Sequence, residues 1–122
     1  MKFTGLMPTL YTRDIRGSVD FYVSALGFEH DGPVGSGAAF VRRDDVEIMF
    51  AWPNKHMPFD APTMTGSLYI RCDDVDAAWG KVKDAARVCY PIEDFDYGMR
   101  EFAIFDNNGY LLQFGQEIDA AS

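Results

Sequence analysis

The sequence predicts an α+β fold made of two βαβββ modules. Three observations support this prediction. Each half of the chain has the pattern of a strand, a helix and three further strands, a polar segment at 54–65 divides the halves, and the halves align at an offset of 60 residues. At this offset Leu10 falls on Ile70 and Asp14 on Asp74, so strand and helix cap keep their order, as internal repeats do.

The first half, at about 5–53, begins with a predicted strand at 7–12. Asp14 is a plausible helix N-cap and Gly27 a helix stop. Apolar residues between them recur at helical spacing, namely Ile15, Val19, Tyr22 and Leu26. Three strands are predicted after the helix, at 28–30, 38–43 and 46–52, with a turn at 43–45.

The second half, at about 66–118, repeats this plan. A strand is predicted at 67–72, and Asp74 can cap a helix whose apolar positions are Val75, Ala78, Trp79 and Val82. Three strands follow, at 87–91, 100–105 and 110–114. Asp-Asn-Asn-Gly at 106–109, between two alternating aromatic-rich runs, predicts a β-hairpin. We expect one domain over 1–122.

Composition limits the classes of function. The net charge of −8 argues against sequence-independent nucleic-acid binding, which requires surplus Lys and Arg. It suits a basic ligand, although an acidic surface also aids solubility. The two cysteines, Cys72 and Cys89, have no metal-site spacing, and no apolar run is long enough to span a bilayer. The start, MKFTGLMP, lacks the apolar core of a signal peptide. We therefore expect a cytoplasmic protein without nucleic-acid or membrane partners.

Two stretches, 8–28 (PTLYTRDIRGSVDFYVSALGF) and 97–116 (YGMREFAIFDNNGYLLQFGQ), resemble those of the vicinal oxygen chelate superfamily. This superfamily includes glyoxalase I, extradiol dioxygenases, fosfomycin-resistance enzymes and the metal-free bleomycin-resistance proteins. The resemblance implies that the modules form a curled mixed sheet around a cleft and that two chains pair as a homodimer. Because one fold hosts many chemistries, the site needs its own argument.

The resemblance also implies four metal-ligand positions, which fall on Met7, Glu47, Ser67 and Gln113. A thioether and a neutral hydroxyl are poor ligands for zinc, nickel or iron, so one carboxylate and one amide remain. We expect no metal cofactor, and we interpret Gln113 as a hydrogen-bonding group in a ligand cleft. Glu47 could instead act as a general base, or pair with an arginine.

Strand alternation predicts which side chains line the cleft. Glu93-Asp94-Phe95-Asp96-Tyr97 adds carboxylates interleaved with aromatic rings, which suits a planar cation but also fits a solvated loop. Arg100 can pair with a neighbour or with a ligand. The predicted ligand-binding residues are Met7, Thr9, Tyr11, Glu47, Met49, Trp52, Ser67, Tyr69, Arg71, Tyr97, Arg100 and Gln113.

The function predicted from these features is metal-free binding of a small organic molecule, as in sequestration of a cationic or aromatic antibiotic, with no catalytic residue. One alternative is a glyoxalase-like lyase or a dioxygenase whose atypical metal site uses Glu47, Gln113 and His56. Another is an accessory domain that works with a partner chain. The sequence leaves the roles of His30 and His56 open.

Overall fold

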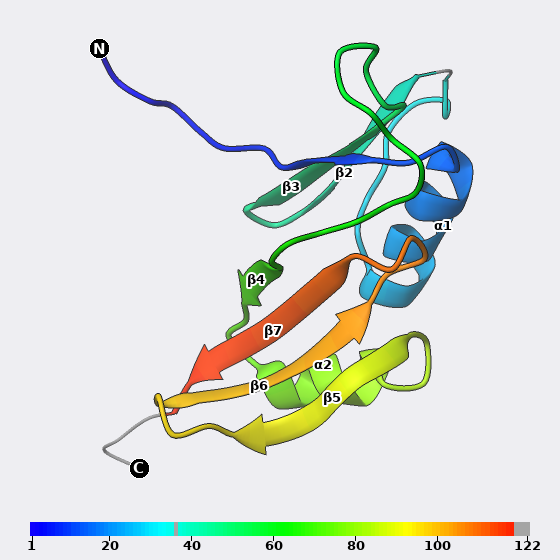
Figure 1. Ribbon diagram of the computed structural model, residues 1–122. Coiled ribbons are helices and arrows are strands. Elements are labelled where there is room, and N and C mark those ends of the chain that lie inside the picture. The colour runs from blue at the N-terminus through cyan, green and yellow to red at the C-terminus, as the bar shows by residue number, and fades with distance from the viewer. Residues whose placement is uncertain (36, 119–122) are drawn as a thin grey trace. The chain divides into compact units, whose positions relative to one another are not determined.

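The computed structural model describes residues 1–35 and 37–118, which form two helices and seven strands in two mixed sheets (Figure 1). The chain divides into two compact units, Met1–Pro62 (unit 1) and Thr63–Ser122 (unit 2). The division falls inside the polar segment predicted at 54–65. The α+β class and the order of elements agree with two βαβββ modules, which confirms the predicted fold class.

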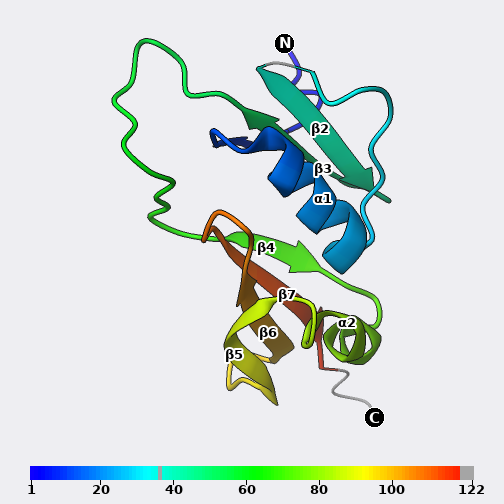
Figure 2. The same ribbon diagram turned by 90° about the vertical axis from the view of Figure 1, so that its right-hand side faces the viewer.

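Unit 1 contains a three-stranded sheet of order β1-β3-β2 and one helix. Its elements are β1 (Thr9–Tyr11), α1 (Ile15–Leu26), β2 (Ala38–Arg43) and β3 (Val46–Ala51). β1 runs parallel to β3, with Thr9 opposite Met49, and β2 runs antiparallel to it. Helix α1 packs on β2 and β3, as Figure 2 shows.

Helix α1 begins and ends where its sequence predicts. The Asp14 carboxylate accepts a hydrogen bond from the Gly17 backbone N–H at 2.9 Å, which satisfies a donor of the first turn. Gly27 ends the helix with φ of 72°, a left-handed conformation that favours glycine. The buried side of the helix is formed by Ile15, Ser18, Val19, Tyr22, Ala25 and Leu26.

The strand predicted at 28–30 is wrong. The structure has only an isolated bridge there, in which Glu29 and Arg42 exchange backbone hydrogen bonds at 2.7 and 2.9 Å. The pairing stops because Gly32 takes a φ of 81° and Pro33, which follows, has no backbone N–H to donate. Unit 1 therefore has one strand fewer than the sequence predicts.

Unit 2 contains a four-stranded sheet of order β4-β7-β6-β5 and one helix. Its elements are β4 (Leu68–Arg71), α2 (Val75–Val82), β5 (Arg87–Asp94), β6 (Met99–Phe105) and β7 (Leu111–Glu117). The β6–β7 hairpin turns as predicted. There Asp106 Oδ1 accepts from the backbone N–H groups of Asn108 and Tyr110 at 2.8 and 2.9 Å, and Gly109 adopts a φ of 86°. β5 extends three residues beyond its predicted end, with register shifts on both sides of Tyr90.

Helix α2 covers one side of this sheet (Figure 1). Asp74 caps it by accepting from the Ala77 N–H at 3.0 Å. Trp79 packs on Phe102 with ring centroids 5.1 Å apart, and Phe102 stacks on Phe114 at 5.0 Å. The core of unit 2 thus lies between α2 and β6–β7, which leaves the opposite side of the sheet to other side chains. Within the described ranges no helix is long and apolar enough to cross a membrane.

Candidate functional site

Glu101, in β6, is the only fully buried charged residue in the part of the chain that the structure describes, at 0% exposure. Successive side chains of a strand point to opposite sides, so Phe102 faces α2 while Glu101 and Ala103 face away from it. In the neighbouring strand β7, Gly115 lies opposite Glu101 and Gln113 opposite Ala103. We call this side of the unit 2 sheet the Glu101 face.

Four donors converge on the Glu101 carboxylate. Oε1 accepts hydrogen bonds from the Tyr69 hydroxyl at 2.9 Å and from the Tyr97 hydroxyl at 2.6 Å. Oε2 accepts from the Tyr90 hydroxyl and, at 3.5 Å, from Nε2 of Gln113. Because an ionised carboxylate offers about four lone-pair sites, these four donors use them all.

Gln113 is held in one orientation by its neighbours. Its Nε2 also donates to the Tyr90 hydroxyl oxygen at 2.9 Å, and its Oε1 accepts a hydrogen bond from the Ser67 hydroxyl. The amide of this β7 residue therefore links β5 to the residue that precedes β4. We call Ser67, Tyr69, Tyr90, Tyr97, Glu101 and Gln113 the Glu101 cluster.

The hydrogen bonds set the charge of the cluster. Burial acts to raise the pKa of Glu101, but the hydroxyls of Tyr90, Tyr97 and Tyr69 outweigh it and hold this pKa below its ordinary value. Burial and the hydrogen bond to Glu101 raise the pKa of Tyr69 and of Tyr90 to about 12. The hydrogen bond to Glu101 also raises the pKa of Tyr97. At neutral pH the cluster is one carboxylate held by three neutral phenols.

This carboxylate is suited to attract a cation rather than to accept a proton. A general base works best with a pKa near the operating pH and a free lone pair within reach of the substrate. Glu101 has a lowered pKa, and its lone pairs are already occupied.

The ring of Phe95 packs on the rings of Tyr90 and Tyr97, whose hydroxyls bind Glu101. It stacks on Tyr97 with centroids 5.4 Å apart and an interplanar angle of 16°, and it meets Tyr90 edge-on with centroids 5.5 Å apart and an interplanar angle of 75°.

On β7, Gly115 leaves room for Tyr69, since a Cβ at Gly115 would lie 2.0 Å from the Tyr69 hydroxyl oxygen.

No ion pair neutralises Glu101 among residues 1–35 and 37–118. The ion pairs within these ranges join Arg43 to Asp44 and Arg100 to Asp76 and Asp94. The charge of Arg71 acts to lower the pKa of Tyr69 but is outweighed there.

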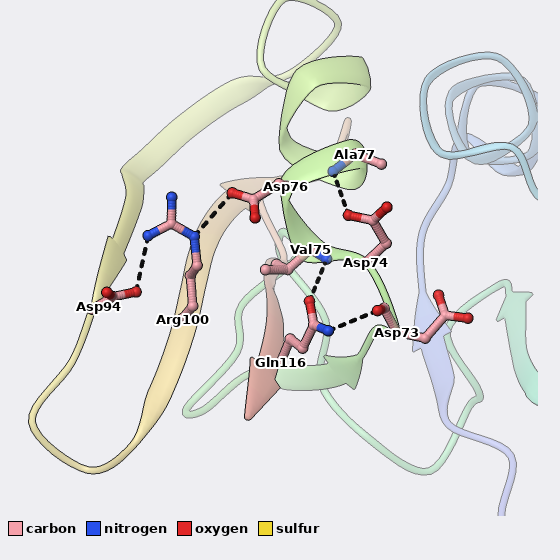
Figure 3. A network of polar contacts seen from close by, with 8 residues as sticks. All are labelled: Asp73, Asp74, Val75, Asp76, Ala77, Asp94, Arg100 and Gln116. Atoms are coloured by element: carbon pink, nitrogen blue, oxygen red, sulfur yellow. Dashed lines mark hydrogen bonds and ion pairs between the residues drawn. The ribbon is translucent and has the colours of Figure 1, made fainter. Parts of the chain in front are cut away.

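Arg100 lies on the other side of the sheet, beside α2 (Figure 3). Its Nε pairs with Asp76 of α2 at 2.9 Å and its Nη1 with Asp94 of β5, also at 2.9 Å. Figure 3 also shows Gln116 below the start of α2, where its amide accepts from the Val75 N–H and donates to the Asp73 carbonyl. Arg100 thus belongs to the contacts that fasten α2 to the sheet, although the sequence placed it among the ligand-binding residues.

Four other predicted ligand-binding residues come together in the Glu101 cluster: Ser67, Tyr69, Tyr97 and Gln113. Arg71 lies two residues after Tyr69 in β4, so it is exposed on the Glu101 face as well. In the acidic run at 93–97, Tyr97 belongs to the cluster and Phe95 packs against it.

The other predicted residues belong to unit 1. Thr9, Tyr11, Glu47 and Met49 share the side of its sheet that faces away from α1, while the alternate residues Leu10, Ile48 and Phe50 are buried beneath the helix. Met7 and Trp52 flank the strands and are 39% and 54% exposed. Tyr11 accepts a hydrogen bond from Nδ2 of Asn54 at 2.7 Å. Glu47 is exposed opposite Arg42, and no ion pair joins it to another described residue.

The histidines take separate places in unit 1. Nδ1 of His30 donates to the Phe40 carbonyl at 3.0 Å, since a carbonyl can only accept. His56 is exposed, and its backbone N–H donates to Asn54 Oδ1 at 2.8 Å.

The family-type metal positions do not fit a divalent ion. Ser67 donates its hydroxyl proton to the amide oxygen of Gln113, so the two positions of unit 2 bind each other and offer no charged ligand. Those of unit 1 supply a thioether and one carboxylate. Across residues 1–35 and 37–118, no three His, Cys, Asp or Glu side chains form a group that could hold a metal ion.

The sequence reasoning missed Glu101, Tyr90, Phe95 and Gly115 as members or supports of a site. The alternation rule could have found the first of them. In Arg100–Phe105 it separates Glu101 from Phe102 and Ile104, which makes Glu101 the one acidic residue on the side of Ala103. Tyr90 carried no such signal, because β5 changes register on both sides of it.

Fold and site together define a class: small α+β proteins of repeated βαβββ modules with polar side chains on the sheet face opposite the helix. The chain belongs to the Glyoxalase/Bleomycin resistance protein/Dioxygenase superfamily, whose family model matches residues 6–114. This confirms the resemblance seen in the sequence. A search of the curated proteins gives no match.

Solved structures share the fold. A protein of unknown function from Agrobacterium tumefaciens str. C58 is 21% identical with a TM-score of 0.79, and the match covers 97% of each chain. TioX from Micromonospora sp. ML1 is 20% identical with a TM-score of 0.73, over 95% of this chain and 100% of its own. A glyoxalase/bleomycin resistance protein/dioxygenase from Nocardioides is 17% identical with a TM-score of 0.77, over 98% and 87%. At these identities the likeness shows the fold alone.

Proposed function

We propose that the protein binds a small organic cation with an aromatic or extended apolar part, without a metal, and that the Glu101 cluster recognises the positive charge. One observation carries the proposal: Glu101 is a fully buried carboxylate, held ionised by three tyrosine hydroxyls, with no cationic side chain paired to it in the described ranges.

The physical argument is one of charge balance. Buried charges in proteins are normally paired or coordinate metals, because their desolvation is costly. Glu101 has hydrogen bonds but no opposite charge in contact, so its negative potential extends to the hydroxyls that surround it. Two unit charges about 4 Å apart at a partly exposed site attract by roughly 4 kcal/mol. A cation placed at these hydroxyls would gain a sizeable fraction of this energy.

The biological role follows the family. Membership in a superfamily that includes bleomycin-resistance proteins supports sequestration of a cationic or aromatic antibiotic as the use of such a site. The net charge of −8 would also attract a cationic ligand at long range.

Calorimetric titration with metal-free bleomycin tests the proposal. We expect saturable binding to the wild-type protein and a loss of about tenfold or more in affinity in Glu101→Gln, which keeps the shape of the side chain and removes its charge. Glu29→Gln is the matched control, because it removes one carboxylate from an exposed position of unit 1 and should bind like the wild type.

Two outcomes would overturn the proposal. One is no binding of bleomycin; the other is equal binding by the wild type and Glu101→Gln. Should Glu101→Gln fail to fold, Tyr97→Phe replaces it, since Tyr97 is 58% exposed and its ring packing would remain. Metal analysis addresses the enzyme alternative: stoichiometric nickel, zinc or iron that disappears in Glu47→Ala would favour a lyase or dioxygenase.

A further inference from the structure

We infer that the cationic group of the ligand carries N–H donors, as a protonated amine, amidine or guanidine does, and that the hydroxyl oxygens of Tyr69 and Tyr97 accept them. This inference rests on the proposed function and names the class of ligand that the Glu101 cluster selects. A quaternary ammonium ion, which has the same charge but no N–H group, should bind poorly.

A ligand cannot reach the carboxylate itself. Glu101 has 0% exposure, and its two oxygens already accept from four donors. A ligand can instead meet the exposed residues Tyr69 and Tyr97, which donate their hydroxyl protons to Glu101.

Two of the three hydroxyls are available as acceptors. Tyr69 and Tyr97 are 39% and 58% exposed, and each donates its proton to the same oxygen, Oε1 of Glu101. No donor from the described residues reaches either hydroxyl oxygen, whereas that of Tyr90 already accepts from Gln113. Because both donate to one atom, the two hydroxyl oxygens lie within reach of a single ammonium or amidinium group.

The aromatic rings offer less to a cation than the hydroxyls do. Recognition of a quaternary ammonium uses the open faces of several rings. Here Phe95 covers one face of Tyr97 by stacking, and its own ring also meets the edge of Tyr90. Ring packing thus occupies part of the surface that an aromatic cage would need, while no donor among the described residues uses the hydroxyl lone pairs of Tyr69 and Tyr97.

Gly115 makes this arrangement possible. Tyr69 reaches Glu101 by crossing β7 above Gly115, where a Cβ would lie 2.0 Å from its hydroxyl oxygen and 2.7 Å from its Cζ. Gly115 is not among the glycines with positive φ, so alanine fits the backbone there. Gly115→Ala should therefore leave β7 in place and move the Tyr69 hydroxyl away from Glu101. Gly115 is thus a positioning residue for Tyr69.

The test compares two probes by calorimetry: 2-phenylethylamine, protonated at neutral pH, and its N,N,N-trimethyl analogue. They share a ring and a positive charge and differ in N–H groups. We expect the amine to bind the wild-type protein about tenfold tighter than the trimethyl probe. Tyr69→Phe, Tyr97→Phe and Gly115→Ala should each reduce this ratio toward one, and the double variant Tyr69→Phe/Gly115→Ala should resemble either single variant.

A measurement on the ligand-free protein checks whether Gly115 positions the Tyr69 hydroxyl beside Glu101. The chain has six tyrosines, so the titration of Tyr69 is obtained as the difference in ultraviolet absorbance between each protein and its Tyr69→Phe variant. This difference should show the pKa of Tyr69 falling from about 12 toward its ordinary value near 10 in Gly115→Ala. An unchanged Tyr69 titration would contradict the role of Gly115.

Other outcomes separate this inference from the proposed function. If the trimethyl probe binds as tightly as the amine and Glu101→Gln weakens both, the inference is wrong and charge recognition stands. If neither probe binds at millimolar concentration, the inference is also wrong, and the bleomycin titration then decides the proposed function alone.

Discussion

The Glu101 carboxylate is stable in a buried position because its neighbours are donors. Each hydrogen bond to a charged group contributes on the order of 1.5–3 kcal/mol to stability, whereas a buried charge without such bonds is strongly destabilising. Tyr69, Tyr90 and Tyr97 come from β4, β5 and the turn after β5, so one side chain ties together three segments of unit 2.

This arrangement predicts a pH dependence of stability. The pKa of Glu101 is lower in the folded state than in the unfolded chain, where a glutamate titrates near pH 4.3. Its contribution to the free energy of unfolding is therefore complete above about pH 4.3 and is lost as the pH falls through the folded-state pKa. Urea unfolding should show wild type more stable than Glu101→Gln at pH 7, with the difference shrinking at acid pH.

The comparison has a control for the loss of one charge, Glu29→Gln, which removes an exposed carboxylate. A difference between wild type and Glu101→Gln that stays constant, or grows, as the pH falls toward 3 would contradict the lowered pKa.

The elements show how local sequence sets local structure. Asp14 and Asp74 cap helices as predicted, and the Asp106–Gly109 turn forms the hairpin that its residues favour, because capping and turn formation depend on near neighbours. The pairing at Glu29 and the ends of β1, β5 and β7 depend on partner strands that the local pattern does not specify, and here the structure differs from the prediction.

Two glycines provide a matched prediction about the helices. Gly80→Ala, at an exposed position of α2 with open space for a Cβ, should raise the free energy of unfolding by about 0.5–1 kcal/mol. Gly27→Ala should lower it by about 1 kcal/mol or more, since Gly27 has a φ of 72° and a Cβ there would lie 2.9 Å from the Arg43 guanidinium. Urea unfolding measures both, and changes of the same sign would contradict the assigned conformations.

Over the whole molecule, the repeat of two βαβββ modules could be predicted because strand, cap and helix face recur at a fixed offset. The candidate site could be predicted only in part. Ser67 and Gln113 follow from family spacing, Tyr69 from strand alternation, and Tyr97 from the acidic and aromatic run at 93–97. Glu101 was not predicted, because it lies on a strand that carries none of the four metal-ligand positions. Gly115 was not predicted, because its role depends on where the Tyr69 side chain points.

Metal independence is a prediction for the whole chain, and it rests on the donor chemistry of Met7, Glu47, Ser67 and Gln113. Dialysis against a strong chelator should leave the melting temperature and the affinity for 2-phenylethylamine unchanged. Loss of binding that added zinc, nickel or iron restores would contradict it and would favour the enzyme alternative.

The homodimer that the family resemblance implies also stays a prediction. Light scattering behind size-exclusion chromatography should give twice the chain mass of 13.7 kDa. A monomer over the whole accessible concentration range would show that binding at the Glu101 cluster, if present, needs one chain only.

The most direct measurement locates the bound cation among the six tyrosines of the chain. Carbon NMR of protein labelled at tyrosine Cζ, assigned with single Tyr→Phe variants, should show the Tyr69 and Tyr97 signals moving as 2-phenylethylamine is added. The signals of the buried Tyr22 and Tyr110 should stay in place. Saturable binding that leaves the signals of Tyr69, Tyr90 and Tyr97 unchanged would contradict recognition at Glu101.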